Sequence, residues 1–286
     1  MATDSAMTGQ PRSRLAAAGW YLLLSAMAAV VLFPLYITVI RALSGTTTTN
    51  SLVPVDLRSG AFSDAWSAGD LGPHLAISLV TTLCIVALQV GTSVLAAYAF
   101  TFLKFPLKRS IFAIVIATLL LPIEVTLLTN FRDLQPLGWV GPSQGLVGAM
   151  AALVLPFGAT ALGIFLLRQG FAGIPRDLRD AAALDGWGHL GFIRHVALPV
   201  SRPVVASFIV ISFLDSYNQY VWPSFVGNVD KYKTAQVVIS GMYKADPQNA
   251  NLAFAAALLI SLPVLALLIF FQKQIVAGLT AGAVKG

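Results

Sequence analysis

Polar and aromatic side chains that could bind a polyhydroxyl solute gather in one short segment. The segment contains Asp215, Tyr217, Asn218, Gln219 and Tyr220. Recognition of a sugar needs hydrogen-bond donors and acceptors beside aromatic faces, and amide, carboxylate and phenol groups supply both. The alternative is an aromatic belt at a membrane surface, to which Tyr220 and Trp222 would belong. An interface does not require the adjacent amides of Asn218 and Gln219, so these two favour a cavity lining or a bridge between helices.

The composition places this segment in a membrane protein. Charged residues make up 10% of the 286 residues, whereas a soluble domain carries about 25%. The mean hydropathy is +0.80, and a soluble globule could not bury that much apolar surface. The composition therefore excludes a soluble enzyme, a disordered chain, a disulfide-stapled secreted domain and a nucleic-acid binder. A single cysteine, Cys84, permits no intrachain disulfide and argues against a metal cluster.

Apolar runs long enough to cross a bilayer predict an all-α protein with six transmembrane helices. A span needs about 20 residues, and six segments qualify: residues 15–40, 74–103, 110–129, 143–167, 200–222 and 251–271. The first could be a secretory signal, because Arg12 and Arg14 precede it. Its apolar run is about twice the usual length of a signal core, which favours an uncleaved helix. The sequence thus predicts a single transmembrane domain over residues 1–286.

The distribution of cations predicts that both termini lie in the cytoplasm. In that orientation twelve of the 18 Lys and Arg residues fall in cytoplasmic segments, as the positive-inside rule requires. The basic net charge of +6 therefore needs no nucleic acid. In the outer segment between the first two spans, Phe62 and Trp66 have the spacing of a short interfacial helix, and a loop is the alternative.

Two acidic residues fall inside predicted spans. A charge in a membrane is costly and usually faces a cavity or a partner, so Glu124 and Asp215 are candidates for the substrate pathway. Glu124 could instead pair with Arg132 near the outer surface. No Lys or Arg lies deep in a span, which favours a neutral cargo over an anionic one.

The longest cytoplasmic loop, residues 168–202, has the pattern of a docking helix. Pro175 suits the first turn of a helix, and Asp177 follows where the helix dipole favours an anion. Gly186 lies where a left-handed residue would end that helix. A second short helical stretch is expected over residues 187–195. The docking face is small, which favours a protein partner over a membrane surface; it contains Leu178, Ala181, Ala182 and Asp185.

The loop resembles the EAA loop of ABC importer permeases. Asp180-Ala181-Ala182 is followed at the family's spacing by Gly186, Val196 and Leu198-Pro199. Asp180 replaces the usual Glu, Val196 replaces Ile, and Trp187 stands where Ala is common. Gly278 to Gly286 resembles the C-terminal tail of the MalG-type subfamily, which serves importers of sugars and of glycerol phosphate. Residues 218–223 and 121–125 are similar to that subfamily's fifth and third spans.

This resemblance implies a permease subunit that works with several partners in the bacterial inner membrane. They are a second, similar permease, two copies of a cytosolic ATPase that binds ATP and Mg, and an external substrate-binding protein. Residues 174–199 would couple the permease to the ATPase, through Asp180, Ala181, Ala182, Asp185, Gly186, Leu198 and Pro199. The cytoplasmic tail, residues 273–286, would become ordered against the ATPases.

The sequence carries no motif for catalysis. No lysine follows a glycine, so a Walker A phosphate loop is missing and the chain is not expected to hydrolyse ATP. The three histidines are scattered, and no metal site or cofactor is proposed for this chain. Two alternatives stay open: an integral-membrane enzyme acting on lipid-linked sugars, and an ion-coupled secondary transporter.

Overall fold

The computed structural model of the chain describes residues 14–45, 51–141, 144–227, 229–247 and 250–281, and only the backbone of 14–16, 123–124 and 274–281. Within those ranges the secondary structure is helical, apart from one isolated bridge between Ser44 and Leu57. Because every backbone polar group must be satisfied inside a bilayer, helices are the expected solution for so apolar a chain.

Four helices form the centre of the bundle: α3 (Leu71–Phe102), α7 (Ala161–Ala172), α11 (Arg202–Tyr217) and α14 (Ala250–Ala281). α3 packs on α7 and α11, and α14 packs on α11. Gly163 of α7 permits the close approach, because a Cβ there would overlap the Phe208 ring and Ser93 Oγ. Small residues at helix crossings serve this purpose in membranes.

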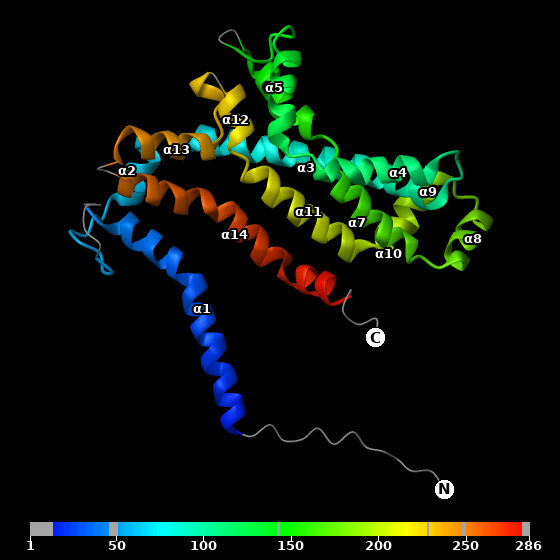
Figure 1. Cartoon of the computed structure of the whole chain (residues 1–286), viewed down its shortest axis with the longest axis horizontal. Coiled ribbons are helices and arrows are strands. Elements are labelled where there is room, and N and C mark those ends of the chain that lie inside the picture. The colour runs from blue at the N-terminus through cyan, green and yellow to red at the C-terminus, as the bar shows by residue number, and fades with distance from the viewer. Residues whose placement is uncertain (1–13, 46–50, 142–143, 228, 248–249, 282–286) are drawn as a thin grey trace.

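The N-terminal part of α1 (Arg14–Leu43) projects away from the bundle, and its C-terminal part contacts the bundle (Figure 1). Its neighbours there are α14 and α2 (Ala61–Ala68). Apolar side chains along its length are largely exposed, for example Tyr21, Leu22 and Val31 at 73%, 74% and 74%. That surface must be covered by lipid or another subunit.

Three helices are long and apolar enough to cross a membrane unbroken: Ala17–Leu43, Leu71–Phe102 and Ala250–Lys273. Three further spans result if each bent helix pair is one crossing. The first pair joins α4 (Lys108–Ala117) and η1 (Thr118–Leu120) to α5 (Ile123–Leu134). The second joins α6 (Leu146–Val154) and η2 (Leu155–Phe157) to α7 with a bend of 53°.

The third pair meets at Ser201 with a bend of 85°. Its first arm contains α9 (His189–Phe192), the π-helix η3 (Ile193–Ala197) and α10 (Leu198–Val200). Its second arm is α11, which is interrupted at residues 218–220 and followed by α12 (Val221–Val226). The predicted span over 200–222 therefore contains a break that the sequence did not reveal.

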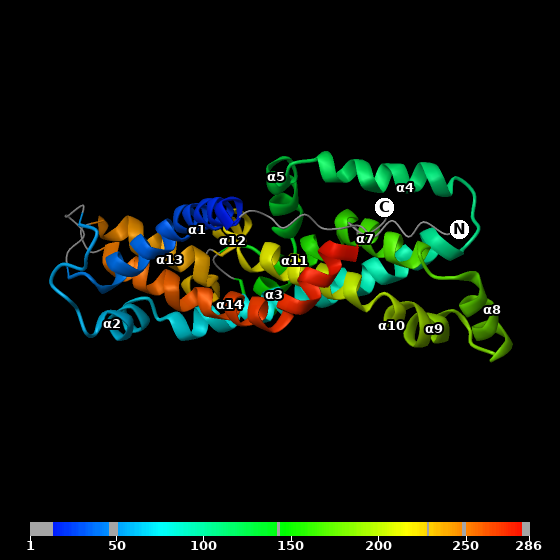
Figure 2. The same cartoon turned by 90° about the horizontal axis from the view of Figure 1, so that it is seen from below.

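The remaining helices lie at the two ends of the bundle (Figure 2). One end carries α8 (Arg176–Leu184) with α9 and α10. The opposite end carries α2, together with η4 (Asp230–Tyr232) and α13 (Ala235–Ala245). α2 confirms the short helix, rather than a loop, at Phe62 and Trp66, and its location at a membrane interface stays a prediction. α14 continues as a helix through Ala281, so the predicted tail is helical as far as that residue, and residues 282–286 lie outside the described part of the chain.

Candidate functional site

A cavity of about 1000 Å³ lies where three helix breaks meet. The breaks are at Leu121–Pro122 before α5, at 158–160 before α7, and at 218–220 after α11. Residues from all three line the cavity. Broken helices in a membrane are tolerated where the backbone faces protein or a water-filled space. This cavity is therefore the candidate solute site in the described chain.

The lining of this cavity mixes polar and apolar side chains and contains no cation. Four of the predicted pathway residues are brought together in it: Asp215, Asn218, Gln219 and Tyr220. Thr118, Thr126, Asn130 and Thr160 add hydroxyl and amide groups from the other two breaks. Among the lining residues Asp215 is the single charged one, and none is Lys, Arg or His. Such a lining can exchange hydrogen bonds with hydroxyl groups but offers no counter-ion for a phosphate or carboxylate.

Asn218 has a positioning role besides lining the cavity. It follows the last residue of α11, and its Nδ2–H donates to the Leu214 carbonyl at 2.8 Å. Its Oδ1 accepts from Gln236 Nε2 at 3.4 Å. The Leu214 carbonyl also accepts from the Asn218 backbone N–H at 3.2 Å, so the side-chain amide adds a second hydrogen bond at the helix end. Asn218 therefore links the break to α13 as well as lining the cavity.

Tyr220 connects the break to α13. Its hydroxyl accepts hydrogen bonds from Ser240 Oγ at 3.1 Å and from Lys244 Nζ at 3.3 Å. The ring is 37% exposed. Tyr220 thus contributes a ring to the cavity wall while its hydroxyl is held by α13.

The side chains of Tyr217 and Trp222 are buried in the bundle and donate hydrogen bonds to backbone carbonyls. Tyr217, predicted on the pathway, is 3% exposed, stacks on Phe213 and donates its hydroxyl to the Ile260 carbonyl of α14 at 2.7 Å. It therefore presents no face to the cavity. Trp222 is 2% exposed and its indole N–H donates to the Ala152 carbonyl at 3.0 Å, so it does not form part of an interfacial belt.

Glu124 lies in α5, and its side chain lies outside the described part of the chain. Two residues that the sequence analysis missed fix the second break. Gln89 of α3 donates to the Phe157 carbonyl at 2.9 Å and accepts from Ser212 Oγ at 2.7 Å. Thr92 donates to the Gly158 carbonyl at 3.0 Å. An amide inside an apolar span was the signal that could have identified Gln89.

The predicted docking helix is α8. It begins after Pro175, and Gly186 follows it with φ of +76°, the left-handed conformation that its position predicted. The second predicted helical stretch is present as α9 and η3, which lead through α10 into α11.

Aromatic contacts hold this loop against α3. The Arg179 guanidinium lies 5.7 Å from the centre of the Phe102 ring, and Tyr98 Oη is 2.6 Å from His189 Nδ1. The rings of Trp187 and His195 meet edge to face, with centroids 3.7 Å apart. The loop is therefore fixed to the end of the bundle rather than tethered loosely to it.

Some of the predicted coupling residues pack against the bundle, and the others are exposed. Ala182 is 6% exposed and packs into the cluster that includes Phe171 and Phe192, and Leu198 packs against the same cluster. Ala182 and Leu198 therefore anchor the loop on its own bundle, which corrects the uniform docking face expected from the sequence. Asp180, Ala181 and Asp185 are exposed, as are Leu178 at 43% and Leu184 at 89%. Pro199 lines a separate groove beside α11.

Comparison with known proteins identifies one family. Residues 89–280 match the family described as "Binding-protein-dependent transport system inner membrane component". Two similar proteins are sn-glycerol-3-phosphate transport system permease proteins UgpE. The protein from Yersinia enterocolitica is 32% identical over 263 residues, and that from Agrobacterium fabrum is 32% identical over 266; both alignments cover 87% of this chain and 91% of the relative.

A solved structure shares the fold. It is a chain of a bacterial ABC transporter involved in the import of the acidic polysaccharide alginate, with a TM-score of 0.75 and 19% identity over 95% of this chain and 99% of that chain. The resemblance carried by the EAA-like loop is thereby confirmed, and the family is that of a transport component rather than an enzyme. This chain belongs to the binding-protein-dependent transport system inner membrane components, the permease subunits of ABC importers.

Proposed function

We propose that the chain is a six-span permease subunit that moves a neutral sugar or related polyol into the cytoplasm by alternating access. The observation that carries the choice of cargo is the cavity lining, which combines one carboxylate, amides and hydroxyls with no cation. Neutral polyols exchange hydrogen bonds with such groups, whereas an anionic cargo would meet Asp215 without a compensating charge. The UgpE relatives are named for an anionic cargo, so this proposal separates the chain from them.

The proposed orientation places both termini, α8 and α9 on the cytoplasmic side. It is supported by the excess of Lys and Arg in those segments and by the location of α8 and α9 at one end of the bundle, opposite α2 and α13 (Figure 2). In this orientation α8 reaches cytosolic ATPases, and the cavity lies nearer the outer surface, where a binding protein delivers cargo. A second permease would complete the route.

Reconstitution tests this proposal. The complex is purified from membranes by a tag on this chain, its subunits are identified by mass spectrometry, and it is placed in proteoliposomes with the binding protein. We expect ATP-dependent uptake of one labelled neutral sugar or polyol from a panel, with uptake of sn-glycerol 3-phosphate at background. Preferred uptake of glycerol phosphate would overturn the neutral cargo while leaving the permease assignment intact.

The same preparation separates the other classes of function. A secondary transporter would take up solute without ATP and would stop when the ion gradient is collapsed. An enzyme acting on lipid-linked sugars would purify without an ATPase and would change the lipid substrate. Either result would refute the importer mechanism.

A further inference from the structure

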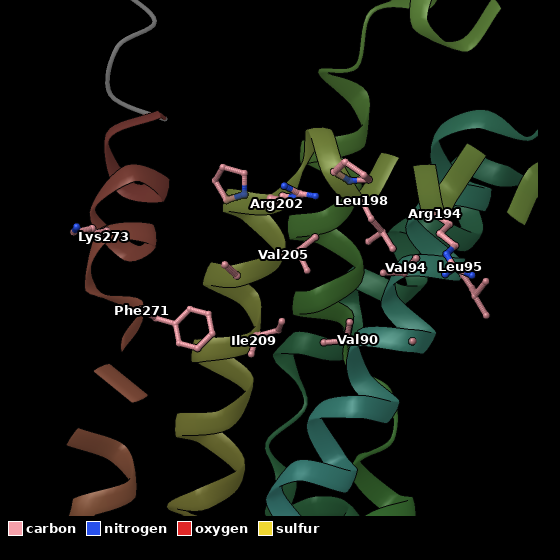
Figure 3. A pocket seen from close by; sticks show the side chains of 14 residues that line it. Val90, Val94, Leu95, Arg194, Leu198, Arg202, Val205, Ile209, Phe271 and Lys273 are labelled. Atoms are coloured by element: carbon pink, nitrogen blue, oxygen red, sulfur yellow. The ribbon is translucent and has the colours of Figure 1, made fainter. Parts of the chain in front are cut away.

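A groove of about 1040 Å³ lies beside the bend at Ser201, between α3, the α10–α11 turn and α14. Apolar side chains form most of its wall (Figure 3). They come from all three elements and include Val90, Val94, Leu95, Ile209 and Phe271. The groove shares no lining residue with the cavity that holds Asn218, so it is a separate feature of the described chain.

Three cations line the same end of this groove. Arg194, Arg202 and Lys273 lie at the level of Leu198 and are spread across the width of the groove, with Lys273 pointing away from the two arginines in this view (Figure 3). Ile209, Val90 and Phe271 lie further along the groove (Figure 3). All three cations are exposed. None pairs with a carboxylate among the described residues, and no Asp or Glu lines the groove. Three like charges at one end of an apolar groove are complementary to a molecule with one anionic end and a long apolar body.

We propose that this groove binds an anionic phospholipid of the cytoplasmic leaflet. The acyl chains lie along the α3 and α11 walls, and the headgroup lies at the end of the groove that carries Arg194, Arg202 and Lys273. The proposal rests on the orientation given above, because that orientation puts the three cations at the cytoplasmic surface. It does not depend on the identity of the cargo.

A transmembrane helix of the second permease fits the groove less well. The cytoplasmic ends of such helices carry an excess of Lys and Arg, so a helix seated here would bring more cations toward the three already present. Like charges at close range repel, whereas a lipid phosphate neutralises them. The charge of the groove therefore selects lipid over a similar subunit.

Lipid retention provides the main test. The complex is purified in mild detergent, offered equal amounts of dioleoyl phosphatidylglycerol and dioleoyl phosphatidylcholine, and examined by native mass spectrometry. We expect the complex to retain phosphatidylglycerol, the anionic lipid, in preference to phosphatidylcholine. Each single change of a groove cation to Gln should lower the retention of phosphatidylglycerol about fivefold. The variant Arg194→Gln, Arg202→Gln and Lys273→Gln should show no preference. Equal retention of both lipids by the wild type would overturn the proposal.

A charge-matched control removes the same number of cytoplasmic cations elsewhere. Lys104→Gln, Arg109→Gln and Arg176→Gln change exposed residues that do not line the groove. This control should keep the preference for the anionic lipid. Loss of preference in the control as well would show a general surface charge effect and would refute a built site.

A shape variant tests the apolar wall without touching charge. A Cβ added at Gly91 of α3 meets no atom within 4 Å, so Gly91→Leu projects into the groove without disturbing the packed core. It should abolish selective retention while the complex still assembles. Gly19→Leu of α1, whose Cβ also meets no atom within 4 Å, is the matched control and should leave retention unchanged. Normal retention by Gly91→Leu would place the lipid elsewhere and overturn the proposal.

A photo-crosslinking residue at Leu95, which is 56% exposed, identifies the occupant directly. A phospholipid adduct supports the proposal, and an adduct with the second permease refutes it. Labelling of a cysteine placed at Leu184 from the cytoplasmic side checks the orientation independently. Correct labelling without lipid selectivity would refute this inference alone, whereas labelling from the outside would refute the orientation on which both proposals rest.

Discussion

The two ends of the molecule are built in opposite ways. At the α8 end, a continuous stretch of chain packs tightly on α3 and α7 through aromatic and other apolar side chains. At the cavity end, three segments far apart in the sequence stop being helical at the same place and leave an open space. Dense packing suits the transmission of force, because packed interiors deform little. An open space bordered by helix breaks suits a solute that must enter and leave.

Gly163→Ala should have the largest effect, because it fills the tight crossing of α7 with α3 and α11 between the two ends. Its Cβ would overlap Phe208 and Ser93, and overpacking costs about 1–3 kcal/mol or more. We expect little assembled complex in membranes, measured by quantitative blotting after purification. Gly91→Ala on α3 is the control, since its Cβ meets open space and should assemble normally. Normal assembly of Gly163→Ala would show that the crossing is looser than described.

Gly186→Val should have the next largest effect, on coupling rather than assembly. Its Cβ meets no atom within 4 Å, so the cost is the left-handed backbone alone, about 1–2 kcal/mol. We expect a complex that assembles but shows less cargo-stimulated ATP hydrolysis. Gly186→Asn, which tolerates this conformation, should retain most of the stimulation. Equal stimulation in both variants would show that the stop after α8 does not matter for coupling.

Asn218→Leu probes the open end. The change roughly keeps the size and removes a cavity amide, while the Leu214 carbonyl keeps its hydrogen bond from the backbone N–H of residue 218. Uptake in proteoliposomes should therefore fall several-fold, as expected for a loss of about 1–2 kcal/mol, while the amount of complex stays near normal. Loss of complex before loss of uptake would make Asn218 a structural residue instead.

Tyr217→Phe should have the smallest effect. The change removes only the hydroxyl that donates to the Ile260 carbonyl, at a cost of about 1 kcal/mol. The thermal midpoint of the purified complex should fall slightly, with no change in cargo preference. A changed preference without a change in stability would return Tyr217 to the substrate pathway.

The dense end was readable from the sequence because its information is local. Pro175, Asp177 and Gly186 mark the limits of one helix, and the spacing to Leu198-Pro199 lies within a single stretch of chain. Even there the direction of Ala182 was missed, since helical periodicity does not say whether a small face meets the chain's own bundle or a partner.

The open end was only partly readable. Asp215, Asn218 and Gln219 stood out because membrane spans seldom carry such residues. The burial of Tyr217 and the bonds made by Gln89 depend on contacts between residues more than 40 positions apart, and the break at 218–220 is bonded to α13 at separations of 18 to 24 positions. No local pattern contains such contacts. The parts of the cavity wall that come from η1 and from residues 158–160 could not be predicted from the sequence for the same reason.

The 85° turn at Ser201 has a mechanical consequence. The arm from His189 to Val200 lies nearly at right angles to the arm from Arg202 to Val226, which contains α11. A sideways push on the first arm would act as a torque about the bend at Ser201. We expect that torque to move the end of α11 at Asn218 together with α3 and α14, on which α11 packs, and so to reshape the cavity.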